Sequence, residues 1–301
     1  MPALAALTNS GATILKRALL SVVLCVGWPV AATHATETLV FTPLPQESPE
    51  TVVAQWKPLL NQVGKALGVT VRIEYLANYG EIIDKFRAGK IDLAQLGPLS
   101  YVVLRETFEP VAPLVHLNES DGRAGYTCAL VAPAESKLAA RDPKNPLKNP
   151  MNIKGRTFAL TQPLSTCGYL GGDSLLRGAG GALENNRYRY LGQHDAVALA
   201  VLRGEFELGS MKTQIARKYA GLGLVVVAES GPLPGVALVA NAATVSPERI
   251  SQIRTLLLDA DAATRSGWGI ARHGVTPAKD SDYDAVRRLR GQTKIPETGN
   301  F

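Results

Sequence analysis

Two short segments place hydroxyl, imidazole and carboxylate side chains where a helix is expected to begin. They are Pro163-Leu164-Ser165-Thr166-Cys167-Gly168-Tyr169-Leu170 and Gly192-Gln193-His194-Asp195-Ala196, and each follows a short segment typical of a strand. A helix start carries unpaired backbone N–H groups and the positive end of the helix dipole, so it can bind an anion. The two segments therefore predict a site that holds an oxyanion.

The side chains of these segments suit that chemistry. The hydroxyls of Ser165 and Thr166 and the phenol of Tyr169 can donate hydrogen bonds, while His194 and Asp195 can hold a partly protonated oxyanion, one donating and the other accepting. Each segment also has a structural interpretation, because Ser-Thr often caps a helix and a helix-start histidine is often structural. Their occurrence in consecutive strand–helix units favours a shared site.

Two more helix starts occur earlier in the chain. Tyr79 follows Asn78 at the first, and Ser100 and Tyr101 follow Gly97-Pro98 at the second. These residues could close over a ligand from the opposite wall, because they offer O–H donors and aromatic surface. The alternative is that the two tyrosines are core residues of amphipathic helices.

The elements that must position these residues alternate between strands and helices. Apolar residues recur at helical spacing from Glu50 to Leu67, where Gly68 is expected to end the helix. Short apolar strands precede further helical segments on both sides of this helix. The alternation predicts an α/β fold with mostly parallel sheets covered by helices on both faces.

Two segments are natural crossing points between two lobes: 125–131 and the Gly- and Pro-rich segment 231–235. They predict a first lobe of residues 36–128 and 233–301 and a second lobe of residues 129–232. Ligands of such α/β lobes collect at the carboxyl ends of the strands, so we expect the binding cleft between the lobes.

The N-terminal segment 1–35 resembles an export signal. Lys16 and Arg17 precede a short apolar core, and small residues around Ala35 suit cleavage. We expect a cleaved signal peptide and a periplasmic protein; a retained anchor is the alternative. The formal net charge of +6 is a mild excess, which suits small anions and is too diffuse to indicate nucleic-acid binding.

Two cysteines remain after the predicted cleavage, Cys128 and Cys167. They can form a disulfide in an oxidising compartment or remain two buried thiols, and the sequence leaves both open. An enzyme with Cys167 as nucleophile and His194 as base would need a third, orienting group, and none is evident. These residues also lack the close spacing of metal ligands. We therefore expect no enzymatic activity, no metal and no cofactor.

Six motifs resemble, in the same order, the phosphonate-, phosphite- and phosphate-binding periplasmic proteins of ABC importers. They are Ala77-Asn78-Tyr79-Gly80, Ile91-Asp92-Leu93-Ala94-Gln95-Leu96-Gly97-Pro98-Leu99-Ser100-Tyr101, Gly125-Tyr126, the Pro163–Tyr169 loop, His194-Asp195-Ala196 and Gly231-Pro232-Leu233-Pro234-Gly235. The resemblance spans residues 39 to 289. It implies a two-lobed type II periplasmic-binding-protein fold that closes like a hinge on a tetrahedral oxyanion.

The resemblance also implies a function. The protein would capture a small phosphorus oxyanion as a monomer and present it to the permease and ATPase of an ABC importer. A periplasmic sensor module that binds a small anion and signals to a membrane receptor is the alternative, because it would use the same cleft. The predicted ligand-binding residues, including two neighbours within the same motifs, are Tyr79, Ser100, Tyr101, Ser165, Thr166, Cys167, Tyr169, His194 and Asp195.

The chain departs from the family pattern at two positions. Cys167 stands where the family loop usually has another serine, which replaces a good hydroxyl donor by a poor one. The segment Gly209-Ser210-Met211-Lys212 stands where the family usually has an acidic residue facing the ligand. If Lys212 faces the cleft, it favours a more fully ionised ligand or one that also carries a carboxylate. If it faces solvent, nothing follows from it.

Overall fold

The computed structural model describes residues 37–138 and 153–301. Residues Thr36–Phe301 form one compact unit. The predicted signal peptide lies outside the described residues, so its cleavage stays a prediction. None of the described helices is long and apolar enough to cross a membrane.

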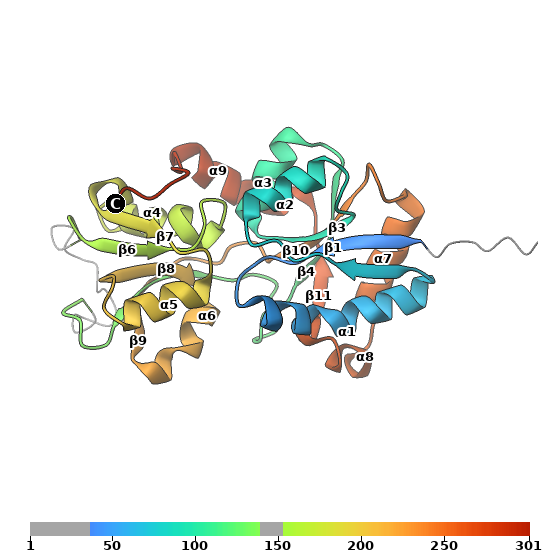
Figure 1. The fold of residues 1–301 in the computed structure, drawn as a ribbon, viewed down its shortest axis with the longest axis horizontal. Coiled ribbons are helices and arrows are strands. Elements are labelled where there is room, and N and C mark those ends of the chain that lie inside the picture. The colour runs from blue at the N-terminus through green and yellow to red at the C-terminus, as the bar shows by residue number, and fades with distance from the viewer. Residues whose placement is uncertain (1–36, 139–152) are drawn as a thin grey trace, which may run out of the picture. The chain divides into compact units, whose positions relative to one another are not determined.

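The first sheet has six strands in the order β11-β4-β10-β3-β1-β2 (Figure 1). Its strands are β1 (Thr38–Thr42), β2 (Thr70–Ile73), β3 (Leu93–Leu96), β4 (Val111–Leu117), β10 (Ala237–Asn241) and β11 (Val275–Pro277). The helices that accompany them in the chain are α1 (Pro49–Leu67), α2 (Tyr79–Arg87), α3 (Pro98–Thr107), α7 (Pro247–Asp259), α8 (Ala262–Ser266) and α9 (Asp284–Gln292).

The second sheet has five strands in the order β7-β6-β8-β5-β9. They are β5 (Cys128–Pro133), β6 (Thr157–Leu160), β7 (Arg187–Tyr190), β8 (Leu208–Lys212) and β9 (Leu224–Glu229). The helices of this part of the chain are α4 (Gly171–Gly178), α5 (His194–Leu202) and α6 (Thr213–Lys218), and a π-helical turn, Thr166–Leu170, precedes α4.

The strand directions correct the expectation of mostly parallel sheets. Strands β2-β1-β3 and β7-β6-β8 are parallel, as strand–helix alternation predicts. However, β10 lies antiparallel between β3 and β4, and β5 lies antiparallel between β8 and β9. Both strands follow a connection that comes from the other sheet, so no helix crossover within their own sheet sets their direction. The sheets are therefore mixed.

The predicted helix that ends before Gly68 is confirmed as α1. Ser48 accepts a hydrogen bond from Thr51 N at its start, and Gly68, with a φ of 64°, ends it in the left-handed conformation. Its apolar face buries Trp56, whose ring lies 4.4 Å from that of Phe41 on β1. This places α1 firmly on the first sheet.

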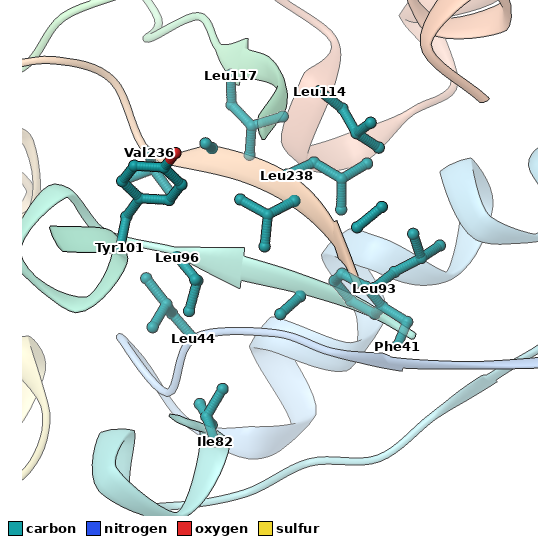
Figure 2. Close-up of a cluster of buried hydrophobic side chains, with 14 of the residues drawn as sticks. Phe41, Leu44, Ile82, Leu93, Leu96, Tyr101, Leu114, Leu117, Val236 and Leu238 are labelled. Carbon is teal, nitrogen blue, oxygen red and sulfur yellow. The ribbon is translucent and has the colours of Figure 1, made fainter. Parts of the chain in front are cut away.

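The main core lies around the first sheet, where β3 and β10 bring buried leucines together. Figure 2 shows Leu93 and Leu96 of β3 beside Leu238 of β10, with Tyr101 of α3 at the edge of the same cluster. Two smaller clusters of buried side chains flank the second sheet. The strand ends that carry the candidate site are thus supported by packed cores on both sides.

The predicted lobe boundaries stay a prediction, and the last residues of the chain contact the second sheet. The backbone N–H of Asn300 donates to Tyr188 O of β7 (3.0 Å), and its side-chain oxygen accepts from Tyr188 N (2.7 Å). Tyr190 donates to Pro296 O over 2.8 Å. The segment after α9, which itself packs on α3, is therefore a third connection between the sheets.

Candidate anion-binding site

A small cavity lies where segments from both sheets meet, and it brings together five of the predicted residues. Its volume of about 10 Å³ leaves room for about one water-sized group. The predicted residues in its wall are Tyr79, Ser165, Thr166, Cys167 and His194. The other wall residues are Leu44, Gln46, Gly97, Tyr126 and Lys212.

Ser165 directly precedes the π-helical turn and uses its hydroxyl toward the cavity rather than as a helix cap. No side-chain cap hydrogen bond is present at this turn. Burial raises the pKa of the neighbouring Tyr79 phenol above its ordinary value, and the Ser165 hydroxyl only partly opposes this shift. The Tyr79 phenol therefore stays protonated and is available as a donor.

The turn packs tightly because of Gly168. A Cβ at this position would lie 2.7 Å from Gln162 O and 2.8 Å from Thr161 Oγ1, so only glycine fits. The backbone N–H of Gly168 donates to Ser165 O over 3.0 Å. This close approach is what folds the loop back and turns its hydroxyls toward the first sheet.

Thr166 links the loop to the first sheet. Its Oγ1 accepts a hydrogen bond from Leu99 N (3.0 Å) in the first turn of α3, a helix whose N-cap residue, Gly97, provides no side-chain cap. Burial raises the pKa of Tyr126, and the Thr166 side chain partly opposes this shift. Thr166, which belongs to the loop after β6 of the second sheet, thus caps the N-terminus of α3, a helix of the first sheet.

His194 is the first residue of α5 and is neutral. Its pKa is lowered to about 3, first by burial and then by the charges of Lys212 and Lys218. Its Nδ1 lies 3.2 Å from Lys212 N, and because this backbone group can only donate, Nδ1 accepts. The ring proton of the neutral imidazole is therefore on Nε2, which makes His194 a donor.

Lys212 lies in the cavity wall, which decides between the two alternatives that the sequence left open. Its side chain is 11% exposed, and Nζ is 2.5 Å from Glu119 Oε1. Nζ also lies 5.1 Å from the centre of the Tyr126 ring. Lys212 is the one cation in the wall among the described residues, and its position at the end of β8 gives the site a buried ammonium group that is paired with Glu119.

Cys167 forms a disulfide with Cys128, with the two Cα atoms 5.0 Å apart. This decides between the disulfide and the two buried thiols that the sequence left open, and a disulfide sulfur has no proton to donate to a ligand. The bond joins the loop to β5. Ser210 Oγ of β8 donates to Cys167 O over 2.8 Å, so the loop is held at this residue from two strands.

Four predicted residues do not line the cavity. Ser100 Oγ donates to Leu164 O (2.9 Å), and Tyr101 donates to Asp280 Oδ1 (2.9 Å) from within the core cluster of Figure 2. Tyr101 is therefore a core residue of its helix, which was the alternative to a role in binding.

Tyr169 packs against Tyr188 of the second sheet, with ring centres 5.2 Å apart. Asp195 Oδ1 accepts from Ala196 N at 2.8 Å, so it does not form the predicted pair with the His194 donor.

Three polar residues of the site were not predicted. Tyr126 and Gln46 line the cavity, and Gln46 O accepts from His194 N over 3.0 Å. Gln162 accepts from Tyr79 N (2.9 Å) and donates to Ala77 O and Gly192 O. Tyr126 was within a recognised motif, Gly125-Tyr126, whereas neither glutamine carried a signal in the sequence, because each acts through contacts far along the chain.

The described residues contain no group of three or more His, Cys, Asp or Glu side chains placed to hold a metal ion. The site is instead a set of hydrogen-bond donors around a small cavity: hydroxyls, a neutral imidazole and an ammonium group. This chemistry binds an anion and provides no evident bond-breaking group.

Comparison with known proteins agrees with this geometry. A family model described as "ABC transporter, phosphonate, periplasmic substrate-binding protein" matches residues 41–283. The chain is 26% identical over 281 residues to the phosphate-import protein PhnD of Mycolicibacterium smegmatis, covering 84% of this chain and 85% of the relative.

Two solved structures show the same fold. PhnD1 from Prochlorococcus marinus, in complex with methylphosphonate, has a TM-score of 0.75 and 17% identity over 85% of this chain and 98% of its own. A binding protein component of an ABC phosphonate transporter from Pseudomonas aeruginosa has a TM-score of 0.71 and 20% identity over 85% of this chain and 86% of its own. The predicted two-lobed type II periplasmic-binding-protein fold is confirmed.

The family match covers most of the chain and describes a substrate-binding transport component rather than an enzyme. It supports the importer function over the sensor alternative, and it implies a small ligand, a membrane permease with its ATPase, and a periplasmic location. The chain belongs to the phosphonate family of periplasmic substrate-binding proteins of ABC transporters.

Proposed function

We propose that this protein binds a small phosphorus oxyanion, that is phosphonate, phosphite or phosphate, in the cavity between the two sheets and delivers it to an ABC importer. The observation that carries the proposal is the convergence of Ser165, Thr166, Tyr79, His194 and Lys212 on one small cavity. The names of the relatives, which refer to phosphate import and methylphosphonate binding, support the same class of ligand.

The chemistry of the wall favours an ionised ligand. His194 Nε2 and Lys212 Nζ can only donate in their present states, and the buried Tyr79 phenol stays protonated. A phosphonate or phosphate group offers several unprotonated oxygens to such donors, and charge-assisted hydrogen bonds are stronger than neutral ones. A neutral ligand of the same size would offer these donors no charged acceptor, and it would therefore bind more weakly.

Ligand binding would also favour a closed arrangement of the two sheets. Tyr79 comes from the segment that follows β2, whereas Ser165 and His194 follow β6 and β7. An anion that contacts all three residues binds more tightly to the closed arrangement, in which they converge, than to an open one. Binding therefore increases the population of the closed arrangement. The closed form is then the one presented to the permease.

A titration with defined anions tests this function. Isothermal calorimetry with phosphate, phosphite, methylphosphonate, 2-aminoethylphosphonate, sulfate and acetate should show binding by at least one phosphorus oxyanion and weak or no binding of acetate. Ser165→Ala combined with Thr166→Ala removes two hydroxyls that meet a charged ligand, so affinity should fall by about 100-fold or more. The matched control, Ser251→Ala with Thr255→Ala, removes two exposed hydroxyls from α7 and should leave affinity unchanged.

The control for folding is thermal unfolding without ligand. Thr166→Ala also deprives Leu99 N of its acceptor, so some loss of stability is expected from the variant itself. Thr166→Ser keeps an acceptor for that group and should retain most of the affinity. Binding of the double alanine variant with wild-type affinity would overturn the site.

Two further expectations belong to the same proposal. We propose that the signal peptide is cleaved after about residue 35 and that the mature protein is a monomer. N-terminal sequencing of protein recovered from the periplasm tests the first, and light scattering of the purified protein tests the second. A mature protein that still begins near Met1, or a stable dimer, would contradict them.

A further inference from the structure

A second, larger pocket adjoins the anion cavity. Gln46 and Lys212 line both. The pocket has a volume of about 290 Å³ and is bounded by the segment before α1, the end of β4, α6 and residues 269–273. Because Lys212 stands in both walls, a group attached to an anion in the small cavity would enter this pocket beside the lysine.

Most of the residues that line this pocket have polar or charged side chains. Besides its charged groups it presents the side chains of Gln46, Gln55, Asn118, Ser120 and Gln214. An alkyl substituent placed against these groups would remove them from water without giving them hydrogen-bond partners, which is unfavourable. The pocket therefore suits a polar or charged substituent.

The charges of the lining point to the sign of that substituent. Two carboxylates line the pocket and each already holds a lysine: Glu119 with Lys212 and Glu47 with Lys218, both at 2.5 Å. Arg272 also lines the pocket, and within the described part of the chain no carboxylate pairs with it; its Nε donates to His273 Nε2 over 3.0 Å. Arg272 is therefore available to bind an acidic group of a ligand.

We propose that the natural ligand is an anion with two acidic groups: a phosphonate or phosphate group in the small cavity and a carboxylate or second phosphoryl group in the adjoining pocket. Lys212 lies at the junction and interacts with both groups, and Arg272 binds the outer one. This inference rests on the proposed function, since it assumes that the phosphorus oxyanion occupies the small cavity.

Three phosphonates of similar length and different charge test the proposal. They are 3-phosphonopropionate, propylphosphonate and 2-aminoethylphosphonate, measured by isothermal calorimetry at one pH and ionic strength. Charge-assisted contacts to Lys212 and Arg272 should make 3-phosphonopropionate bind about tenfold more tightly than propylphosphonate. The amine of 2-aminoethylphosphonate would face Arg272, so it should bind no better than the propyl compound.

Arg272→Gln tests the outer contact without touching the anion cavity. Because Arg272 is exposed, its contact is screened, and the variant should lower the affinity for 3-phosphonopropionate by about threefold to fivefold. Its affinity for propylphosphonate should not change. The matched control is Arg288→Gln, which removes one exposed positive charge from α9, outside both cavities, and should change neither affinity.

The outcomes separate this inference from the proposed function. If all three phosphonates bind equally, if 2-aminoethylphosphonate binds most tightly, or if Arg272→Gln affects all three alike, the two-acid ligand is wrong while the phosphonate site stands. If neither these compounds nor phosphate and phosphite bind, the proposed function fails and this inference fails with it.

Discussion

The helix starts on the two sheets behave differently. On the second sheet, Ser165, Thr166 and His194 all reach the cavity, as predicted. On the first sheet, Tyr79 reaches it, but Ser100 and Tyr101 do not. The difference follows the position of each residue within its helix rather than the sheet it belongs to.

Residues at the very start of a helix line the cavity, and later ones leave it. Tyr79 and His194 are the first residues of α2 and α5, whereas Ser100 and Tyr101 are the third and fourth of α3. Each residue rises about 1.5 Å and turns about 100°, so the fourth lies about 4.5 Å farther along the axis than the first. Tyr169 is likewise the fourth residue of its turn. Side-chain chemistry at a helix start is therefore informative mainly for its first one or two residues.

The largest effect is expected from the disulfide, which holds the helix start of the second sheet and has no counterpart at α2 or α3. Replacing Cys128 and Cys167 by serine removes a crosslink between residues 39 apart, so the free energy of unfolding should fall by about 3–4 kcal/mol. Urea denaturation of the two proteins measures this, and ligand affinity should fall as well because Ser165 and Thr166 lose their anchor. An unchanged stability would show that the bond does not restrain the loop.

The next effect distinguishes two neighbours in one helix start. His194→Ala removes a buried donor to a charged ligand and should weaken methylphosphonate binding by about 10- to 100-fold. Asp195→Ala, one position later, should change it less than about twofold. Calorimetry on both variants checks this. If Asp195→Ala weakens binding more than His194→Ala does, the first residue of α5 is not the one that binds the ligand.

A smaller effect should appear in the dependence of stability on pH. The folded-state pKa of His194 is lowered to about 3, below the ordinary value of 6.5, so the unfolded chain binds a proton there that the folded protein does not. Stability is therefore retained above pH 6.5 and is lost as the pH falls toward 3, by up to about 1.4 kcal/mol per pH unit. Denaturation at pH 7.5, 6 and 5 measures the slope, and His194→Gln should reduce it. The same slope in the variant would locate the proton uptake elsewhere.

The smallest effect compares two buried tyrosines. Tyr79→Phe removes a phenol from the cavity wall and should weaken ligand binding by about two- to tenfold, the range for one hydrogen bond. Tyr101→Phe removes the donor to Asp280 and should lower stability by about 1 kcal/mol without changing affinity. Calorimetry and thermal unfolding of both variants separate the two roles. Equal losses of affinity would place Tyr101 in the site after all.

Much of the fold follows from local patterns. The helical spacing from Glu50 to Leu67 and the glycine after it predict α1 correctly, because capping and one apolar face are properties of a short segment. The antiparallel insertion of β5 and β10 could not be predicted in this way. Each of these strands takes its direction from the sheet that it enters, and its neighbours there lie far away along the chain.

The sequence by itself determined which groups stand at the helix starts, and hence that the site is made of hydroxyl and imidazole donors, because a helix start is a local feature. Only the tertiary structure decided the state of those groups. The tautomer of His194 depends on the backbone of Lys212, the cap of α3 comes from Thr166, and Lys212 itself is turned into the cavity beside Glu119. Each of these contacts joins residues far apart in the chain, and burial, charge and hydrogen-bond direction at the site depend on them.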